Sequence, residues 1–162
     1  MISLSELPNR KDTRLDGYDY SDAGFYFVTI CVKDRENLLG SVVVGANCVR
    51  PTPNVGIIVD AEIDRLSRVY SDVSVDKYVV MPNHVHLIIR IENDGRTQFA
   101  PTISRIIKQF KGSITKQLGY SIWQRSFYDH IIRNDVDYTR ICQYIDENPS
   151  RWSEDEYYSR GS

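Results

Sequence analysis

The sequence lacks the features that would tie the protein to a membrane, a disulfide scaffold or a uniformly basic surface. It contains no apolar run of the roughly 18 residues that a spanning helix needs. Its three cysteines, Cys31, Cys48 and Cys142, are widely spaced. This argues against a disulfide framework or a zinc cluster and favours a reducing cytoplasm. The formal net charge is −2, so any binding of nucleic acid must rely on local positive charge.

The composition is that of a globular protein with a substantial core. Apolar residues make up 41% of the 162 residues and charged residues 26%. The length fits one compact domain and is short for two. We therefore expect a single domain over residues 1–162, divided into an N-terminal arm (1–24), a core (25–152) and a tail (153–162).

Apolar patterns predict a mixture of strands and helices along the chain. Strands are expected at 25–32, 40–44, 78–81, 84–91 and 122–124, and helices at 60–70, from 101 onward and at 135–148. The second strand should pair with the first as a hairpin, 45–56 should form a loop, and Asp60 should cap the first helix. This order predicts an α+β fold, a ferredoxin-like (split βαβ) sandwich with helices packed on one face of an antiparallel sheet.

His84 and His86 carry the clearest chemical signal. They are two of only three histidines in the chain and are separated by one residue on a predicted strand. Because side chains alternate along a strand, both imidazoles leave the same face and could hold one metal ion. Buried structural histidines are the alternative, which the spacing alone does not exclude.

Tyr144 and Asn148 lie one turn apart on the last predicted helix, so their side chains share a face. Ordinary boundary packing by one of 11 tyrosines is the alternative reading of Tyr144. Taken with the two histidines, the amide oxygen of Asn148 would complete a nitrogen and oxygen ligand set suited to Mg²⁺ or Mn²⁺. A tyrosine beside such an ion could attack a phosphodiester.

These residues fall within blocks that resemble the single-tyrosine HUH transposases. Residues 78–89 (YVVMPNHVHLII) resemble the histidine-hydrophobic-histidine block of that family, and residues 144–149 (YIDENP) resemble its catalytic-tyrosine helix. Residues 123–130 (WQRSFYDH) and the arm at 14–31 point to one branch, the REP-associated tyrosine transposases. The resemblance runs from about residue 10 to residue 152, with an interruption at 45–56.

The resemblance implies a metal-dependent enzyme that cuts and rejoins single-stranded DNA. Tyr144 would form a 5′-phosphotyrosine link, while His84, His86 and Asn148 would hold Mg²⁺ or Mn²⁺. The substrate would be single-stranded or hairpin DNA with flanking inverted repeats. The protein would be a cytoplasmic, nucleoid-associated monomer or homodimer. Tyr128 is a competing nucleophile, but it has no amide four residues further on.

Positive charge for DNA binding is expected at eight positions: Arg10, Lys11, Arg14, Arg105, Lys108, Lys111, Arg125 and Arg140. Those on the helix that begins at 101 could follow a phosphate backbone, although a solvated helix face explains them equally well. Aromatic residues between 123 and 128 could stack on unpaired bases or pack in the core. The third histidine, His130, has either a structural or a DNA-contacting role.

Two other functions remain open at this point. A non-catalytic nucleic-acid-binding module on the same sheet would have no use for the histidine pair. A replication initiator or relaxase of the HUH type usually carries further domains, which 162 residues do not accommodate.

Overall fold

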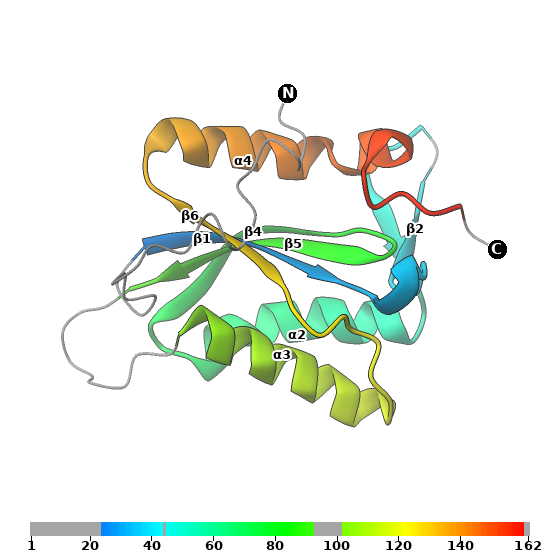
Figure 1. Cartoon of the computed structure of the whole chain (residues 1–162), viewed down its shortest axis with the longest axis horizontal. Coiled ribbons are helices and arrows are strands. Elements are labelled where there is room, and N and C mark those ends of the chain that lie inside the picture. Colours follow the sequence, from blue (N-terminus) through cyan, green and yellow to red (C-terminus); the bar gives the residue numbers. More distant parts are fainter. Residues whose placement is uncertain (1–23, 44, 93–101, 161–162) are drawn as a thin grey trace.

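The computed structural model describes residues 24–43, 45–92 and 102–160, whose centre is a four-stranded sheet with helices on both faces (Figure 1). The strands lie in the order β4 (Val73–Val80), β5 (His84–Ile91), β1 (Gly24–Cys31) and β6 (Tyr128–Ile132). All neighbouring strands are antiparallel. With α2 (Val55–Val69) before β4 and α3 (Ile103–Leu118) before β6, this is the split βαβ arrangement. The predicted α+β, ferredoxin-like class is confirmed.

The main core lies between the sheet and the helices α2 and α3, below the sheet in Figure 1. The helix predicted from residue 101 onward is α3, and its apolar stripe is buried there, as Ile103, Ile106, Ile107, Phe110 and Ile114. Thr102 caps the start of α3 by accepting a hydrogen bond from the backbone N–H of Arg105, and Gly119 ends the helix in a left-handed conformation. Among the described residues, no helix is long and apolar enough to cross a membrane.

A second, smaller apolar cluster lies on the opposite face of the sheet, under α4 (Asp135–Glu147). Ile141 and Ile145 of α4 pack there against Phe27 and Ile88 of the central strands. The prediction of helices on one face holds for α2 and α3, but it is wrong for α4, which covers the opposite face. The helix α4 adds another layer because every second side chain of β1 and β5 points away from the main core.

The segment after β1 differs from the sequence prediction. The strand β2 (Gly40–Val42) pairs with β3 (Val49–Pro51) in a separate two-stranded sheet, so the predicted hairpin with β1 is wrong. The expected loop at 45–56 contains β3 and the first two residues of α2. Asp60 is an interior residue of α2, which starts five residues earlier, after Asn54. Gly56 allows this early start, because a Cβ there would collide with the carbonyl oxygen of Leu39.

The fourth strand of the central sheet is also displaced from its predicted position. Residues 122–124 form only an isolated bridge between Trp123 and Val32, and the strand is β6, which begins at Tyr128. The apolar side chains of Ile122 and Trp123 are buried in the main core without a sheet ladder. After α4, the chain continues into the 3-10 helix η3 (Pro149–Glu154).

Candidate metal and tyrosine site

The two histidines of β5 lie side by side on the face of the sheet that α4 covers. His84 and His86 are both 0% exposed, and their ring centroids are 4.5 Å apart. They share this face because they alternate with Val85, which points into the main core. Since β5 is held on both sides by β4 and β1, the spacing of the two imidazoles is set by a rigid part of the fold.

The protonation of His84 follows from its neighbour Asn83. The Nδ2 of Asn83 donates to two backbone carbonyls, those of Arg35 (3.2 Å) and Tyr157 (2.7 Å). The Oδ1 of Asn83 therefore faces His84, and because it can only accept, the Nδ1–H of His84 donates to it at 2.8 Å. Burial lowers the pKa of His84 to about 3, so the ring is neutral and its Nε2 carries a lone pair.

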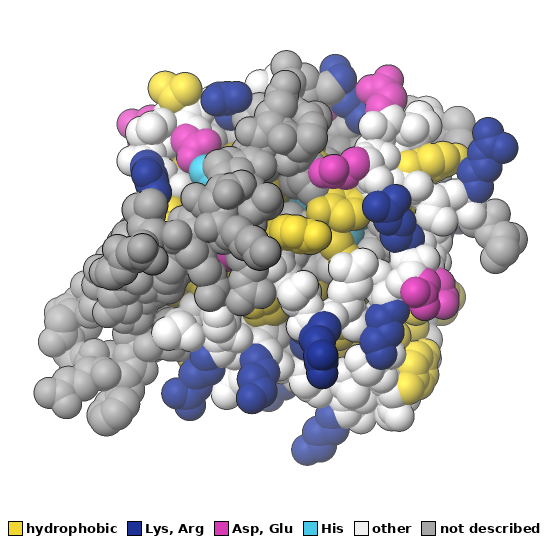
Figure 2. All heavy atoms as spheres, viewed as in Figure 1, with side chains coloured by type: hydrophobic (Ala, Val, Ile, Leu, Met, Phe, Trp, Pro, Cys, Tyr) yellow, Lys and Arg dark blue, Asp and Glu magenta, His cyan; other side chains and the backbone are white. Residues whose placement is uncertain are grey.

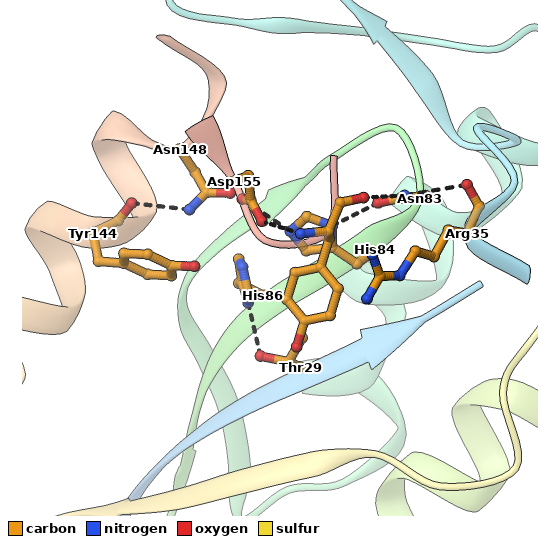
Figure 3. Close-up of polar contacts among 9 residues, drawn as sticks. Thr29, Arg35, Asn83, His84, His86, Tyr144, Asn148 and Asp155 are labelled. Carbon is orange, nitrogen blue, oxygen red and sulfur yellow. Dashed lines mark hydrogen bonds and ion pairs between the residues drawn. The ribbon is translucent and has the colours of Figure 1, made fainter. Parts of the chain in front are cut away.

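His86 is oriented in the same way by Thr29 of the neighbouring strand β1. Its Nδ1 lies 2.8 Å from the Oγ1 of Thr29, a hydroxyl that can accept the Nδ1–H (Figure 3). Burial and the adjacent His84 hold the pKa of His86 well below its usual value. A partner on Nδ1 that fixes the ring and leaves Nε2 free is the usual arrangement of metal-binding histidines.

Three polar atoms at this place are buried and have no hydrogen-bond partner. They are the Nε2 of His84, the Nε2 of His86 and the Oδ1 of Asn148. Asn148 is buried just after α4, where its Nδ2 donates weakly to the carbonyl of Tyr144 at 3.4 Å. Unsatisfied buried acceptors are costly, and a cation that accepts all three lone pairs would satisfy them. The residues present therefore fit a divalent metal.

Tyr144 projects from α4 toward His86 (Figure 3). The two ring centroids are 5.2 Å apart, and the ring of Tyr144 also lies edge-to-face with that of Phe27, at 6.1 Å between centroids. Tyr144 is only 7% exposed, and burial together with the nearby carboxylate of Asp155 raises the pKa of its hydroxyl. The hydroxyl is therefore protonated at neutral pH and must lose its proton if it acts as a nucleophile.

Two residues of the predicted tail complete the surroundings of the histidines and were missed in the sequence. The carboxylate of Asp155 and the two histidines offer ligand atoms that all lie within 4.8 Å of one another, a group that can hold a divalent cation. The ring of Tyr157 lies 4.6 Å from that of His84. No sequence motif marks either residue, because both come next to the histidines only through the fold of the segment after α4.

The basic residues predicted for DNA binding are dispersed. Figure 2 shows Lys and Arg side chains along the lower edge of the molecule, where α3 lies in Figure 1. Arg105 and Lys108 are exposed there, on the opposite side of the sheet from the histidines. Lys111 is committed elsewhere, since its Nζ donates to the carbonyls of Gln124 (2.9 Å) and Ser126 (3.0 Å).

The other expected DNA contacts and the two remaining candidates also have definite places. Arg140 is exposed on α4 and Arg125 on the segment before β6. The arm residues Arg10, Lys11 and Arg14 lie outside the described residues. His130 pairs through Nε2 with the carboxylate of Asp137 at 2.7 Å, away from the histidine pair. Tyr128 is 43% exposed and lies opposite Thr29 in the sheet.

Comparisons with known proteins give relatives but no matching family model. A Haemophilus influenzae protein named only as uncharacterized is 32% identical over 173 residues, which cover 94% of each chain. An Escherichia coli protein named REP-associated tyrosine transposase is 35% identical over 75 residues, which cover 46% of this chain. The match spans 43% of that transposase, less than half of its length.

A solved structure extends the similarity to the fold. It is described as a REP-associated tyrosine transposase bound to a REP hairpin, and it matches with a TM-score of 0.63 and 26% sequence identity. The match covers 83% of this chain and 71% of that one. The resemblance seen in the sequence blocks is therefore confirmed. The chain belongs to one family with the Haemophilus influenzae protein, and in sequence and fold it is a relative of the REP-associated tyrosine transposases.

Proposed function

We propose that this protein is a metal-dependent transposase that cuts and rejoins single-stranded DNA through a covalent link to Tyr144. The observation that carries the proposal is the group of three unpartnered buried acceptors, on His84, His86 and Asn148, beside the tyrosine ring. Buried polar atoms are usually paired, so three unpaired acceptors gathered at one place favour a metal site over a structural histidine pair. A non-catalytic binding module would need neither these acceptors nor a buried tyrosine next to them.

The chemistry assigned to Tyr144 is a transesterification. Its hydroxyl oxygen attacks the scissile phosphorus and the P–O3′ bond breaks. The tyrosine loses its proton, and the departing 3′ oxygen takes up a proton to become a hydroxyl. The product is a 5′-phosphotyrosine and a free 3′-hydroxyl, which can reverse the reaction and rejoin the strands. Because the phosphodiester energy is conserved, the reaction needs no nucleotide cofactor.

His84, His86 and Asn148 would hold Mg²⁺ or Mn²⁺ in this scheme. When bound, the ion would supply Lewis acidity, which would polarise a phosphate oxygen and favour the ionised form of a nearby hydroxyl. The protein contributes orientation: Asn83 and Thr29 fix the two imidazoles, and α4 sets Tyr144 and Asn148 on one face. The burial that raises the pKa of Tyr144 also excludes water, which would otherwise compete as nucleophile.

The proposed substrate is hairpin DNA with a single-stranded foot. The related structure is described as bound to a REP hairpin, and the exposed cations Arg105, Lys108 and Arg140 offer local positive charge. These cations face different sides of the molecule, so we infer that they bind phosphates of separate DNA segments. A protein with this substrate would work in the cytoplasm at the nucleoid, as a monomer or homodimer.

The test is covalent trapping. A hairpin oligonucleotide labelled on the 3′ side of the cleavage point is incubated with Mn²⁺, and label on the denatured protein is measured. Tyr144→Phe should abolish the label while leaving DNA and Mn²⁺ binding intact, and EDTA should abolish it in the wild type. The matched control is Tyr128→Phe, which should retain the label.

Each other outcome of this experiment would indicate a different nucleophile or a different function. Label that persists in Tyr144→Phe and disappears in Tyr128→Phe would mean that the nucleophile is misassigned. Metal-dependent cleavage without bound label would indicate a nuclease, and DNA binding without cleavage would indicate a binding module. Calorimetry should show weaker Mn²⁺ binding in His84→Ala and in His86→Ala, and unchanged binding in either would remove that histidine from the ligand set.

A further inference from the structure

The chain segment after α4 turns back over the histidine pair and is tied down there by hydrogen bonds. The Nδ2 of Asn83, the residue that orients His84, donates to the carbonyl of Tyr157 at 2.7 Å. The Nδ2 of Asn37 donates to the carbonyl of Ser159 at 2.9 Å. The position of this C-terminal segment, residues 149–159, is therefore coupled to the geometry of the site.

Within the segment, one carboxylate oxygen is aimed at the histidines. The side chain of Asp155 is only 5% exposed. The backbone N–H of Tyr157 donates to its Oδ1 at 2.8 Å, and this bond leaves Oδ2 facing the Nε2 of His84 at 3.8 Å. That separation is too long for a hydrogen bond. Two ligands of one ion, each about 2.1 Å from it, would lie about 3 Å apart at right angles and about 3.4 Å apart at a tetrahedral angle, so a shift of a few tenths of an ångström or more would bring both atoms onto one ion.

The carboxylate of Asp155 has no cationic partner among the described residues. Its one ion-pair contact there is with the Nε2 of His84 at 3.8 Å, and the Nδ1 of that ring is already bonded to Asn83. A buried carboxylate without a counter-charge is costly. The neighbouring atoms are the unpartnered Nε2 of each histidine, which offer lone pairs and no positive charge. A divalent cation satisfies all of these groups at once.

We propose that Asp155 is a ligand of the metal and that metal binding pins the C-terminal segment to the site. The ion would then be held by two imidazoles, the amide oxygen of Asn148 and a carboxylate that reaches it from beyond α4. By linkage, metal binding stabilises the docked segment, and the docked segment raises metal affinity by the same factor. The proposal shares its metal with the proposed function but is independent of DNA and of the reactivity of Tyr144.

The first measurement is Mn²⁺ affinity by calorimetry on the full-length protein without DNA. Asp155→Asn should weaken binding about 10- to 100-fold, the range seen when a metal site loses one supporting group. The matched control is Glu156→Gln, which removes the same charge one residue away on an exposed side chain and should leave the affinity unchanged. Asparagine has the size of aspartate and removes a buried charge, so Asp155→Asn keeps the fold.

The second measurement follows the segment itself. Trypsin can cleave after Arg151, an exposed residue of η3, and after Arg68, an exposed residue of α2. Mn²⁺ should slow cleavage after Arg151 in the wild type and in Glu156→Gln, but not in Asp155→Asn, whereas cleavage after Arg68 should not respond to the metal. Equal Mn²⁺ affinity in Asp155→Asn and wild type, or protection of Arg151 that survives this substitution, would overturn the proposal.

These outcomes are separable from the test of the proposed function. If Tyr144→Phe still shows metal-dependent protection of Arg151 and the wild type forms no covalent DNA link, then the transposase mechanism fails and the ligand assignment stands. If the covalent link forms and Asp155→Asn binds Mn²⁺ normally, the reverse holds.

Discussion

Lowering the pH from 7 to 5 should weaken Mn²⁺ binding by a moderate and calculable amount. Protons compete with a metal for its ligands, so the effect depends on the pKa of each ligand in the metal-free protein. Burial raises the pKa of Asp155 to about 6 and lowers that of His84 to about 3, and His86 is lowered as well. Between pH 7 and 5, Asp155 therefore gains a proton while the two histidines stay neutral.

The size of the effect follows from these values. With a pKa of about 6, the free carboxylate of Asp155 falls to roughly one part in 11 at pH 5, so the affinity should drop about tenfold. Histidines with the ordinary pKa of about 6.5 would each cost about 25-fold over the same interval, or roughly 600-fold together. The contribution of Asp155 to Mn²⁺ affinity is fully present above its pKa and is lost as the pH falls through that pKa. Burial of the histidines thus predicts that Mn²⁺ affinity depends only weakly on pH between 7 and 5.

Calorimetry at pH 7, 6 and 5 measures the dependence directly, with Asp155→Asn as the control. This variant should bind more weakly than the wild type at pH 7 but should lose little further affinity at pH 5, because its remaining ligands do not titrate there. A loss of several hundredfold in the wild type would refute the reasoning, since it would mean that the histidines titrate as if exposed. A tenfold loss that persists in Asp155→Asn would refute the role of that carboxylate.

Three further predictions concern stability, each measured by urea unfolding of the metal-free protein. Acidification from pH 7 to 5 should cost about 2–3 kcal/mol: each of the two histidines, protonated only when unfolded, loses about 2, and Asp155, whose pKa is raised, returns about 1. An unchanged midpoint would contradict this. Lys111→Met should cost about 1–3 kcal/mol, because two backbone carbonyls lose a charged donor, while the salt dependence of DNA binding stays the same. Gly56→Ala should cost about 1–3 kcal/mol, since its Cβ meets the carbonyl of Leu39, whereas Gly112→Ala, with open space around it, should stabilise α3. Equal effects of the two glycine substitutions would show that the close approach at Gly56 is relieved without cost.

Local patterns were sufficient for the elements that hold the histidines and the tyrosine. The strand β5 and the helices α3 and α4 have apolar residues at regular spacing, so their faces could be predicted from neighbours a few positions away. For the same reason, the spacing of His84 and His86 and that of Tyr144 and Asn148 predicted which side chains share a face. That the two pairs face each other follows from α4 crossing the sheet above β5, which no local pattern contains.

The errors arise where long-range contacts decide the structure. The pairing of β2 with β3 depends on tertiary context, since by composition β1 is an equally plausible partner for β2. The short edge strand β6 has little periodicity, whereas the buried Ile122 and Trp123 imitate a strand. Asp155 reaches the site only because η3 reverses the chain, and a single carboxylate in a polar tail carries no signal of its own.

The unequal filling of the two faces of the sheet has a consequence for local opening of the fold. The face under α2 and α3 holds most of the buried apolar side chains, whereas α4 rests on a much smaller cluster. Detaching α4 therefore exposes far less apolar surface than global unfolding does. The backbone amide protons of α4 should exchange with solvent at a lower free energy than those of β5. Tyr144 would then belong to a helix, α4, that can detach from the sheet by local unfolding, while β5, which carries the histidines, remains folded.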